Sequence, residues 1–261
     1  CPGKPVYSIG RPAFDKAVIN LSEDKTFSII VKNNSKENKY IESISLNGKS
    51  LYTPFCNHQD IANGGTMEDV VKYAQPKGIG VWLWYHSGAG RENDTIAARR
   101  IMSDPELRRA EMKRISEIGV KGIKVDFFDS DKQRIIQLYP AILKDAADNH
   151  LLVDLHGATL PRGFERTYPN MMTTEAIRGA ETLGRQQRCD KAAEHNATVP
   201  FTRNVVGSMD YTPVTFSNKI RQGVEAIRQT TVAHQLALAV VFESGFQCFA
   251  DRAEAYLSLP E

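Results

Sequence analysis

Four short apolar runs in this chain each end in a polar or acidic side chain, and helical patterns separate them. The runs read GVWLWYHS, KGIKVDFF, LLVDLHG and NMMTTEA, and they fall between residues 80 and 176. Strands that are apolar on both faces and alternate with helices are typical of a parallel sheet covered by helices. We therefore predict an α/β fold for this part of the chain.

The polar strand ends favour one α/β architecture over another. An open nucleotide-binding sheet would carry a GxGxxG loop after a strand, and SGAGRE at residues 87–92 lacks that spacing. In a barrel, the active site is built from side chains at the C-terminal ends of several strands. The pattern predicts a (β/α)8-type (TIM) barrel. About six suitable strands can be counted, so the first two would be missing and the barrel would be incomplete.

The first 67 residues follow a different pattern. KAVINL and TFSIIVKNN alternate apolar and polar residues, and turn-forming stretches such as SEDK and LNGKS separate the strands. We predict a sandwich-like, antiparallel β-rich segment over residues 1–67. Residues 68–261 then form the barrel domain.

Local signals mark the helix ends within the barrel region. Asp104 and Pro105 precede a helical pattern that stops at Gly119, as expected for an N-cap, a first-turn proline and a C-terminal glycine. We expect Asp129 and Asp131 to cap the helix that follows them. Pro140, inside that helix, is expected to kink or split it.

Composition excludes several functional classes. The formal net charge of +2 gives no indication of nucleic-acid binding. No apolar run reaches the roughly 18 residues that a membrane helix needs, so we expect no membrane segment. The four cysteines, Cys1, Cys56, Cys189 and Cys248, are scattered without metal-ligand or redox spacing.

The acids at the strand ends suggest hydrolysis of a glycosidic bond. Asp126 lies too early in its segment to cap the next helix, and Glu175 and Glu181 follow the fourth run. Two carboxyl groups on either side of a glycosidic bond can cleave it, one as nucleophile or base and the other as acid. The acid must hold a proton near neutral pH, so its surroundings must raise its pKa. An ion pair with Arg178 would explain one of the two glutamates structurally.

Further polar and aromatic side chains accompany these acids. Lys124 shares a strand face with Asp126 and would favour its ionised form or bind a sugar hydroxyl. Trp84 either packs in the barrel wall or offers a stacking face to a sugar. Other candidates for hydroxyl binding, each with a structural alternative as a buried polar group whose hydrogen bonds are satisfied, are His86, Asp154 and His156. Arg203 and Asp210 are expected to line the same site.

Residues 68 to about 260 resemble glycoside hydrolase family 97. The resemblance rests on segments in the same order, VKYAQPKGIGVWLWYHSG, GIKVDFFDSD, LLVDLHGATLPRGFERTYPNMMTTEAIRGAE, EHNATVPFTRNVVGSMDYTP and HQLALAVVFESGFQCFAD. It implies a (β/α)8 catalytic barrel that acts on α-glycosides with calcium near the active site. A periplasmic or secreted bacterial location is also implied.

The resemblance assigns individual roles. Inverting members carry a base glutamate where this chain has Gly157, so the retaining α-galactosidase branch is implied. Asp126 matches the nucleophile of that branch, Glu181 its acid/base and Glu175 a calcium ligand. The expected substrate is an oligosaccharide or other terminal α-galactoside.

Residues 1–67 resemble instead the C-terminal β region of glycoside hydrolase family 92, the calcium-dependent α-mannosidases. The matching stretches include CPGKPVYSIGRPAFDKAVINL and HQDIANGGTM. None of that family's catalytic acids is recognised here, which ranks an α-mannosidase low. A second alternative is a carbohydrate-binding or structural remnant whose pocket is incomplete.

Overall fold

The computed structural model describes residues 6–8, 15–22, 25–33, 35, 43–46, 49–51, 55–57, 67–89, 97–219 and 223–257. The chain divides into two compact units. The first comprises Cys1–Val81 with Glu117–Val120, and the second comprises Trp82–Ser116 with Lys121–Glu261. The domain boundary at residue 67 stays a prediction.

The first unit contains three antiparallel strand pairs. They are β1 (Val6–Ser8) with β6 (Phe55–Asn57), β2 (Lys16–Ser22) with β3 (Lys25–Ile30), and β4 (Ile44–Leu46) with β5 (Lys49–Leu51). The stretches SEDK and LNGKS, predicted to be turns, connect the strands of the last two pairs along the chain, and their central residues lie outside the described ranges. Helix α2 (Met67–Ala74) and the 3-10 helix η1 (Gln75–Lys77) also belong to this unit. The antiparallel β structure is therefore present in the described part of residues 1–67.

The second unit is built on a parallel sheet. Its strands are β7 (Trp82–His86), β8 (Gly122–Asp126), β9 (Leu152–Leu155) and β10 (Met171–Thr174), which lie side by side in chain order. A parallel bridge between Thr174 and Met209 continues the sheet by one position beyond β10. The α/β fold with a parallel sheet is confirmed. In the described part of the chain the sheet has four strands, so barrel closure stays a proposal.

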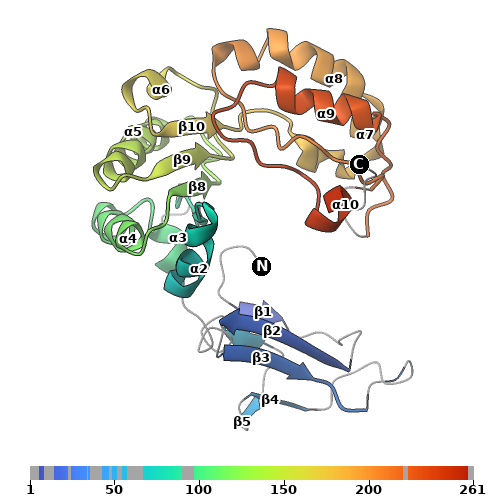
Figure 1. Ribbon diagram of the computed structural model, residues 1–261. Helices are drawn as coiled ribbons and strands as arrows, with labels where there is room; N and C mark the ends of the chain where they lie inside the picture. Colours follow the sequence, from blue (N-terminus) through green and yellow to red (C-terminus); the bar gives the residue numbers. More distant parts are fainter. Residues whose placement is uncertain are drawn as a thin grey trace. The chain divides into compact units, whose positions relative to one another are not determined.

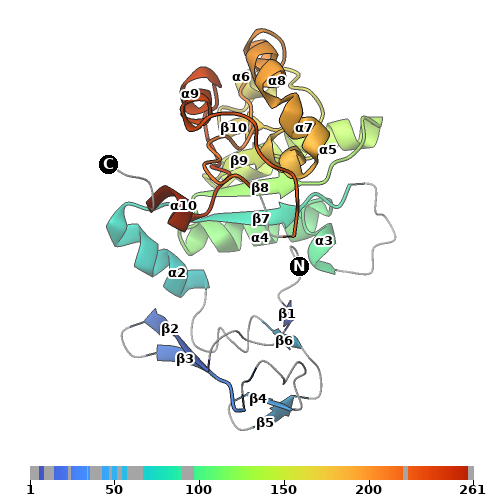
Figure 2. The same ribbon diagram turned by 90° about the vertical axis from the view of Figure 1, so that its right-hand side faces the viewer.

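Helices lie on both sides of this sheet. Figures 1 and 2 show α4 (Pro105–Glu117) and α5 (Gln133–Asp148) on one face, and the segment from α7 to α10 on the other. Ile123 and Val125 of β8 are completely buried, as are Met112 of α4 and Ile142 of α5. Because side chains alternate along a strand, Lys124 and Asp126 face the other way. The apolar face thus forms the core, and the polar face is left for the site.

Along the chain, the remaining helices fall either between two strands of the sheet or after β10. They are α3 (Ala97–Arg100), α6 (Phe164–Thr167), η2 (Ala180–Gly184), α7 (Gln186–Asp190), α8 (Ala192–Thr198), η3 (Val199–Phe201), η4 (Asn204–Val206), α9 (Val232–Val241) and α10 (Ala253–Leu257). A second apolar cluster that includes Leu183, Tyr211, Leu238 and Phe242 joins several of them. No helix in the described ranges has the length and hydropathy needed to span a membrane.

The helix-end predictions had mixed outcomes. The carboxylate of Asp104 accepts the backbone N–H of Glu106 at 2.9 Å and of Leu107 at 3.1 Å, which confirms the N-cap. The prediction that Asp129 and Asp131 cap α5 is wrong, because α5 begins after Lys132 with no side-chain cap. Asp129 instead adopts a φ of 49° and donates its N–H to the carbonyl of Gly157. Pro140 lies inside α5 without splitting it.

A buried ion pair joins α4 to α5. Arg108 Nε lies 2.7 Å from Asp145 Oδ2, and Arg108 Nη1 donates to the carbonyl of Met102 at 2.8 Å. Both side chains are less than 10% exposed. Replacing Asp145 would therefore leave a buried guanidinium without its counter-charge.

We predict that Asp145→Ala lowers the free energy of unfolding by about 3–5 kcal/mol, because a buried charge loses its partner. Urea unfolding followed by circular dichroism measures this change. Asp148→Ala is the control one turn further along α5, since Asp148 pairs with Lys144 on the surface and its loss should change stability little. Equal losses in the two variants would contradict the assignment.

Candidate active site

The strand ends bring the predicted polar side chains to one edge of the sheet. His86 and Asp126 are paired directly in the register of β7 and β8. The backbone N–H of His156 donates to the carbonyl of Val125, and that of Glu175 donates to the carbonyl of Leu155. His86, Asp126, His156 and Glu175 therefore end four neighbouring strands side by side, as the sequence pattern predicts.

A left-handed residue follows most of these strand ends. Phe127 has a φ of 65°, Gly157 of 52° and Ala176 of 38°, and Thr212 has a φ of 58° two residues after Asp210. A non-glycine residue in this region costs of order 1 kcal/mol. Such strained positions persist only where the surrounding structure holds them, and here they turn the chain sharply just beyond each polar side chain.

Asp126 is held by three donors. Its Oδ1 accepts the N–H of Phe127 at 2.6 Å, its Oδ2 accepts Trp84 Nε1 at 3.2 Å, and His156 Nδ1 lies 3.4 Å from Oδ1. Burial by itself would raise the pKa of Asp126, but these donors outweigh it and bring the pKa below the ordinary value. Asp126 is therefore ionised at neutral pH and fixed in orientation.

Gly157 lies directly against this carboxylate. A Cβ atom at position 157 would lie 3.0 Å from Asp126 Oδ1 and 2.8 Å from the backbone nitrogen of Phe127. The left-handed φ of 52° adds to this requirement. A side chain at position 157 and Asp126 in its present position are thus mutually exclusive unless the backbone moves.

Two glutamates and His156 form a second group. Ligand atoms of His156, Glu175 and Glu181 all lie within 4.8 Å of one another. Glu175 Oε2 accepts the N–H of Gly157 at 2.7 Å and lies 3.4 Å from His156 Nδ1. Burial and the adjacent Glu181, to which it is hydrogen-bonded, raise the pKa of Glu175 to about 7. Glu181, near the start of η2, is the more exposed of the two acids.

A charged cluster lies deeper in the sheet, two residues before the strand ends, and we call it the deeper cluster. Lys124 pairs in register with Trp84 and Asp154, and its Nζ lies 2.9 Å from Asp154 Oδ2 and 2.5 Å from Asp210 Oδ2. Cys248 Sγ is 3.9 Å from the same ammonium. Burial and the facing Asp210 raise the pKa of Asp154 to about 7, because one ammonium serves two buried carboxylates. The two carboxylates in turn raise the pKa of Lys124 despite its burial.

The structure brings together most of the predicted site residues. They are Trp84, Lys124, Asp126, Asp154, His156, Glu175, Glu181 and Asp210, and His86 lies beside Asp126 at the end of β7. The Arg203 guanidinium, which was predicted to line the site, donates to the backbone carbonyls of Thr174, Glu175 and Ala176. Cys248 was missed, because a single cysteine in FQCFAD gives no signal that a distant loop brings it to Lys124.

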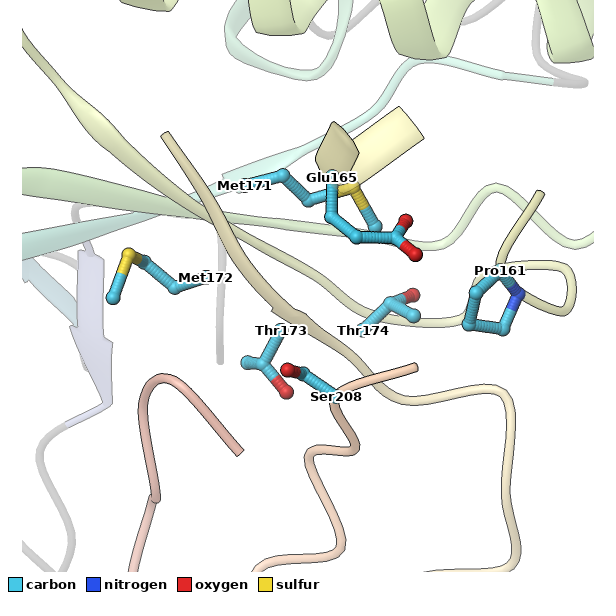
Figure 3. Close-up of a pocket in the computed structure, with 7 residues that line it drawn as sticks. All are labelled: Pro161, Glu165, Met171, Met172, Thr173, Thr174 and Ser208. Atoms are coloured by element: carbon cyan, nitrogen blue, oxygen red, sulfur yellow. The ribbon is translucent and has the colours of Figure 1, made fainter. Parts of the chain in front are cut away.

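A separate pocket lies alongside β10. Figure 3 shows it lined by Pro161, Glu165, Met171, Met172, Thr173, Thr174 and Ser208. None of the acids described above lines it. We therefore place the candidate site at the acids of the strand ends and not in this pocket.

We predict that Gly157→Ala destabilises the protein more than Gly163→Ala does. Both glycines have a left-handed φ, which costs a new alanine about 1–2 kcal/mol. At Gly163 nothing lies within 4 Å of the new Cβ, whereas at Gly157 it meets Asp126 and Phe127. Urea unfolding of the two variants isolates the steric contribution, and equal losses would show that position 157 has room for a side chain.

We also predict a pH dependence of stability that arises from Asp154. Its folded pKa of about 7 lies above its ordinary value, so the folded state binds this proton more tightly than the unfolded state. The stability from this group is complete below about pH 4 and is lost as the pH rises towards 7. Asp210→Asn removes the carboxylate that raises this pKa and should flatten the fall.

Urea unfolding at a series of pH values from 4 to 8 measures this slope. Asp148→Asn, which alters an exposed carboxylate, should keep the unaltered slope. An Asp210→Asn variant with an unchanged slope would contradict the proposed coupling between the two buried acids.

Comparison with known proteins places this geometry in a family. Residues 37–177 match the family model Glycoside hydrolase 97, and residues 1–72 match the model Glycosyl hydrolase family 92 catalytic domain. A probable retaining alpha-galactosidase of Streptomyces bingchenggensis is 38% identical over 192 residues, covering 74% of this chain and 27% of that protein. A retaining alpha-galactosidase of Bacteroides thetaiotaomicron is 32% identical over 202 residues, covering 75% and 28%.

Solved structures of similar proteins support the same family. A beta-arabinopyranosidase is 35% identical with a TM-score of 0.68, covering 78% of this chain and 33% of that one. A variant Glycoside Hydrolase Family 97 enzyme in complex with panose, from Pseudoalteromonas sp. strain K8, has a TM-score of 0.59 at 24% identity, covering 76% and 31%, and shows the fold alone. The chain spans less than a third of the length of the curated relatives that it matches. On the family match and these identities, the chain belongs to glycoside hydrolase family 97.

Proposed function

We propose that this chain carries the catalytic site of a retaining glycosidase that cleaves terminal α-galactosides. The observation that carries the proposal is the pairing of an ionised, firmly held Asp126 with the Glu175–Glu181 acid pair around one imidazole, His156. Relatives named retaining alpha-galactosidase support the substrate class. The chain-order parallel sheet supports its origin in a (β/α)8 barrel.

The mechanism is a double displacement. Asp126 attacks the anomeric carbon, the glycosidic bond breaks, and Glu181 gives its proton to the departing oxygen. Water then attacks the same carbon and gives a proton to Glu181, and the bond to Asp126 breaks. The hydrogen bonds from Trp84 and Phe127 keep Asp126 unprotonated and aimed for the first step.

The site offers two candidates for the acid. Glu181 is our assignment because it is the more exposed of the pair, where a leaving group and water reach it. Glu175 is its rival, because burial and the adjacent Glu181 raise its pKa to about 7. Activated aryl glycosides need little protonation of the leaving group, so they separate the acid from a residue that only holds it in place.

Calcium fits this group. Burial and the adjacent Glu181 raise the pKa of Glu175, so a cation bound between the two carboxylates would be favourable, and hard oxygen donors are the ligands that calcium prefers. Glu175 would hold the ion, with Glu181 beside it. A bound calcium would keep Glu175 ionised and attract a substrate oxygen.

In the deeper cluster, Lys124 is the residue that can donate to a sugar hydroxyl. Its side chain is 22% exposed, whereas those of Asp154 and Asp210 are completely buried and hold its ammonium group in place. His156 Nε2 lies 3.9 Å from Asp210 Oδ2 and so borders both levels. Trp84 donates to Asp126, and we assign its half-buried ring to the wall of the same site. A sugar whose anomeric carbon meets Asp126 would place a hydroxyl within reach of Lys124, two residues earlier on the same face of β8.

We predict that Asp126→Ala lowers kcat for a nitrophenyl α-galactoside at least about 1,000-fold, because the covalent intermediate no longer forms. Added azide should restore part of the turnover and give the β-galactosyl azide, since azide attacks from the face that Asp126 vacates. Proton NMR of the first product of the unaltered chain should show the α anomer. Asp131→Ala, which alters an exposed acid beyond the same strand, should keep full activity.

The outcomes separate the alternatives. Full activity in Asp126→Ala would refute the nucleophile assignment. Sugar binding without turnover in the unaltered chain would favour a binding remnant, consistent with its short span of the relatives. Preference for a β-arabinopyranoside or an α-mannoside, tested in parallel, would redirect the substrate class.

A further inference from the structure

Arg203 makes an unusual set of contacts. Its side chain is 6% exposed, although it lies in the short segment between η3 and η4. Its guanidinium donates to five backbone carbonyls, those of Thr174 (2.9 Å), Glu175 (3.2 Å), Ala176 (3.2 Å), Gly207 (2.9 Å) and Ser208 (3.2 Å). All five of these hydrogen bonds go to the main chain.

Three of these carbonyls belong to consecutive residues at the end of β10. Successive carbonyls of an extended strand point in opposite directions, so one planar group reaches three in a row only where the chain turns. The turn is present, because Ala176 has a φ of 38°. The direction of the Glu175 side chain depends on this turn, since Glu175 is its central residue.

The other two carbonyls belong to the segment that leads to Asp210. Gly207 and Ser208 precede Met209, which bridges to Thr174, and the N–H of Asp210 donates to the carbonyl of Thr174 at 3.1 Å. Arg203 thus ties together the two chain ends that carry Glu175 and Asp210. Glu175 belongs to the group around His156, and Asp210 belongs to the deeper cluster around Lys124.

We propose that Arg203 is a positioning residue, which fixes the Glu175 carboxylate against the N–H of Gly157 through the backbone carbonyls of residues 174–176. The bond from Gly157 to Glu175 measures 2.7 Å and reports that placement directly. The consequence for turnover rests on the proposed glycosidase function, whereas the placement itself does not.

Lysine cannot replace this arginine. A guanidinium offers five N–H donors in one rigid plane, whereas an ammonium offers three donors from a single atom. Arg203→Lys keeps the charge and much of the length but cannot span both chain segments. Buried carbonyls then lose their donors, and the turn at Ala176 loses its support.

Arg228 provides a matched control. Its guanidinium also donates to backbone carbonyls, those of Phe216, Ser217 and Thr230, away from the acids. Nearby, the N–H of Phe216 donates to the carboxylate of Asp251 at 2.8 Å. This bond is the counterpart of the one from Gly157 to Glu175.

The first experiment measures amide hydrogen exchange by NMR in the full chain. Arg203→Lys should speed exchange of the Gly157 amide at least about tenfold and leave the Phe216 amide unchanged. Arg228→Lys should give the reverse pattern. Retained protection of Gly157 in folded Arg203→Lys would overturn the proposal.

The second experiment compares leaving groups. Arg203→Lys should lower kcat/KM for an unactivated α-galactoside at least about tenfold more than for a dinitrophenyl α-galactoside, because only the former needs the positioned acid pair. Arg228→Lys should affect both substrates equally. An equal loss for both substrates in Arg203→Lys would reduce Arg203 to a purely structural role and overturn the proposal.

Two further results would need a different reading, namely no turnover by the unaltered chain and a variant that does not fold. If the unaltered chain turns over no α-galactoside, the proposed function fails, and the Gly157 amide still tests the positioning role. If Arg203→Lys does not fold, exchange of the Arg203 Nε–H and the Gly157 amide is followed in the unaltered chain as urea increases. A shared urea dependence, distinct from that of Phe216, supports the proposal, and separate dependences overturn it.

Discussion

The register of the parallel strands is the constraint on which the site depends. Trp84, Lys124 and Asp154 align across β7, β8 and β9, and His86 aligns with Asp126 two residues further on. Because side chains alternate along a strand, this register collects charged groups on one face and leaves Ile123 and Val125 for the core. A slip of one residue would bury the charges among the helices and expose the core.

Charge compensation follows from that alignment. The deeper level holds one ammonium between two buried carboxylates, and the upper level holds one imidazole among three acids. In both groups the acids outnumber the cations. Burial and a neighbouring acid therefore raise the pKa of Asp154 and of Glu175. Asp126 has a lowered pKa because its donors are better placed. The same sheet edge thus holds one carboxylate with a lowered pKa and two with a pKa raised to about 7.

The backbone beyond the strands matters as much as the strands themselves. Left-handed residues after β8 and β10 turn the chain away, and a glycine after β9 makes room for Asp126. Arg203 satisfies carbonyls that these turns remove from the sheet ladder. Buried carbonyls need such partners, because leaving them without a donor costs free energy. The acids are therefore held by main-chain geometry and not only by contacts with one another.

The sequence by itself determined the parallel α/β class and the position of Asp126 and Glu175 at strand ends. Those features are local: strand periodicity and the position of an acid at a strand end can be read within ten residues. Only the tertiary structure decided the partners that join distant segments. Cys248 lies beside Lys124, the Arg203 guanidinium donates to backbone carbonyls, and Asp129 lies in a turn where a helix cap was predicted. These outcomes depend on how loops cross the sheet edge, and loop paths carry no periodic signal in the sequence.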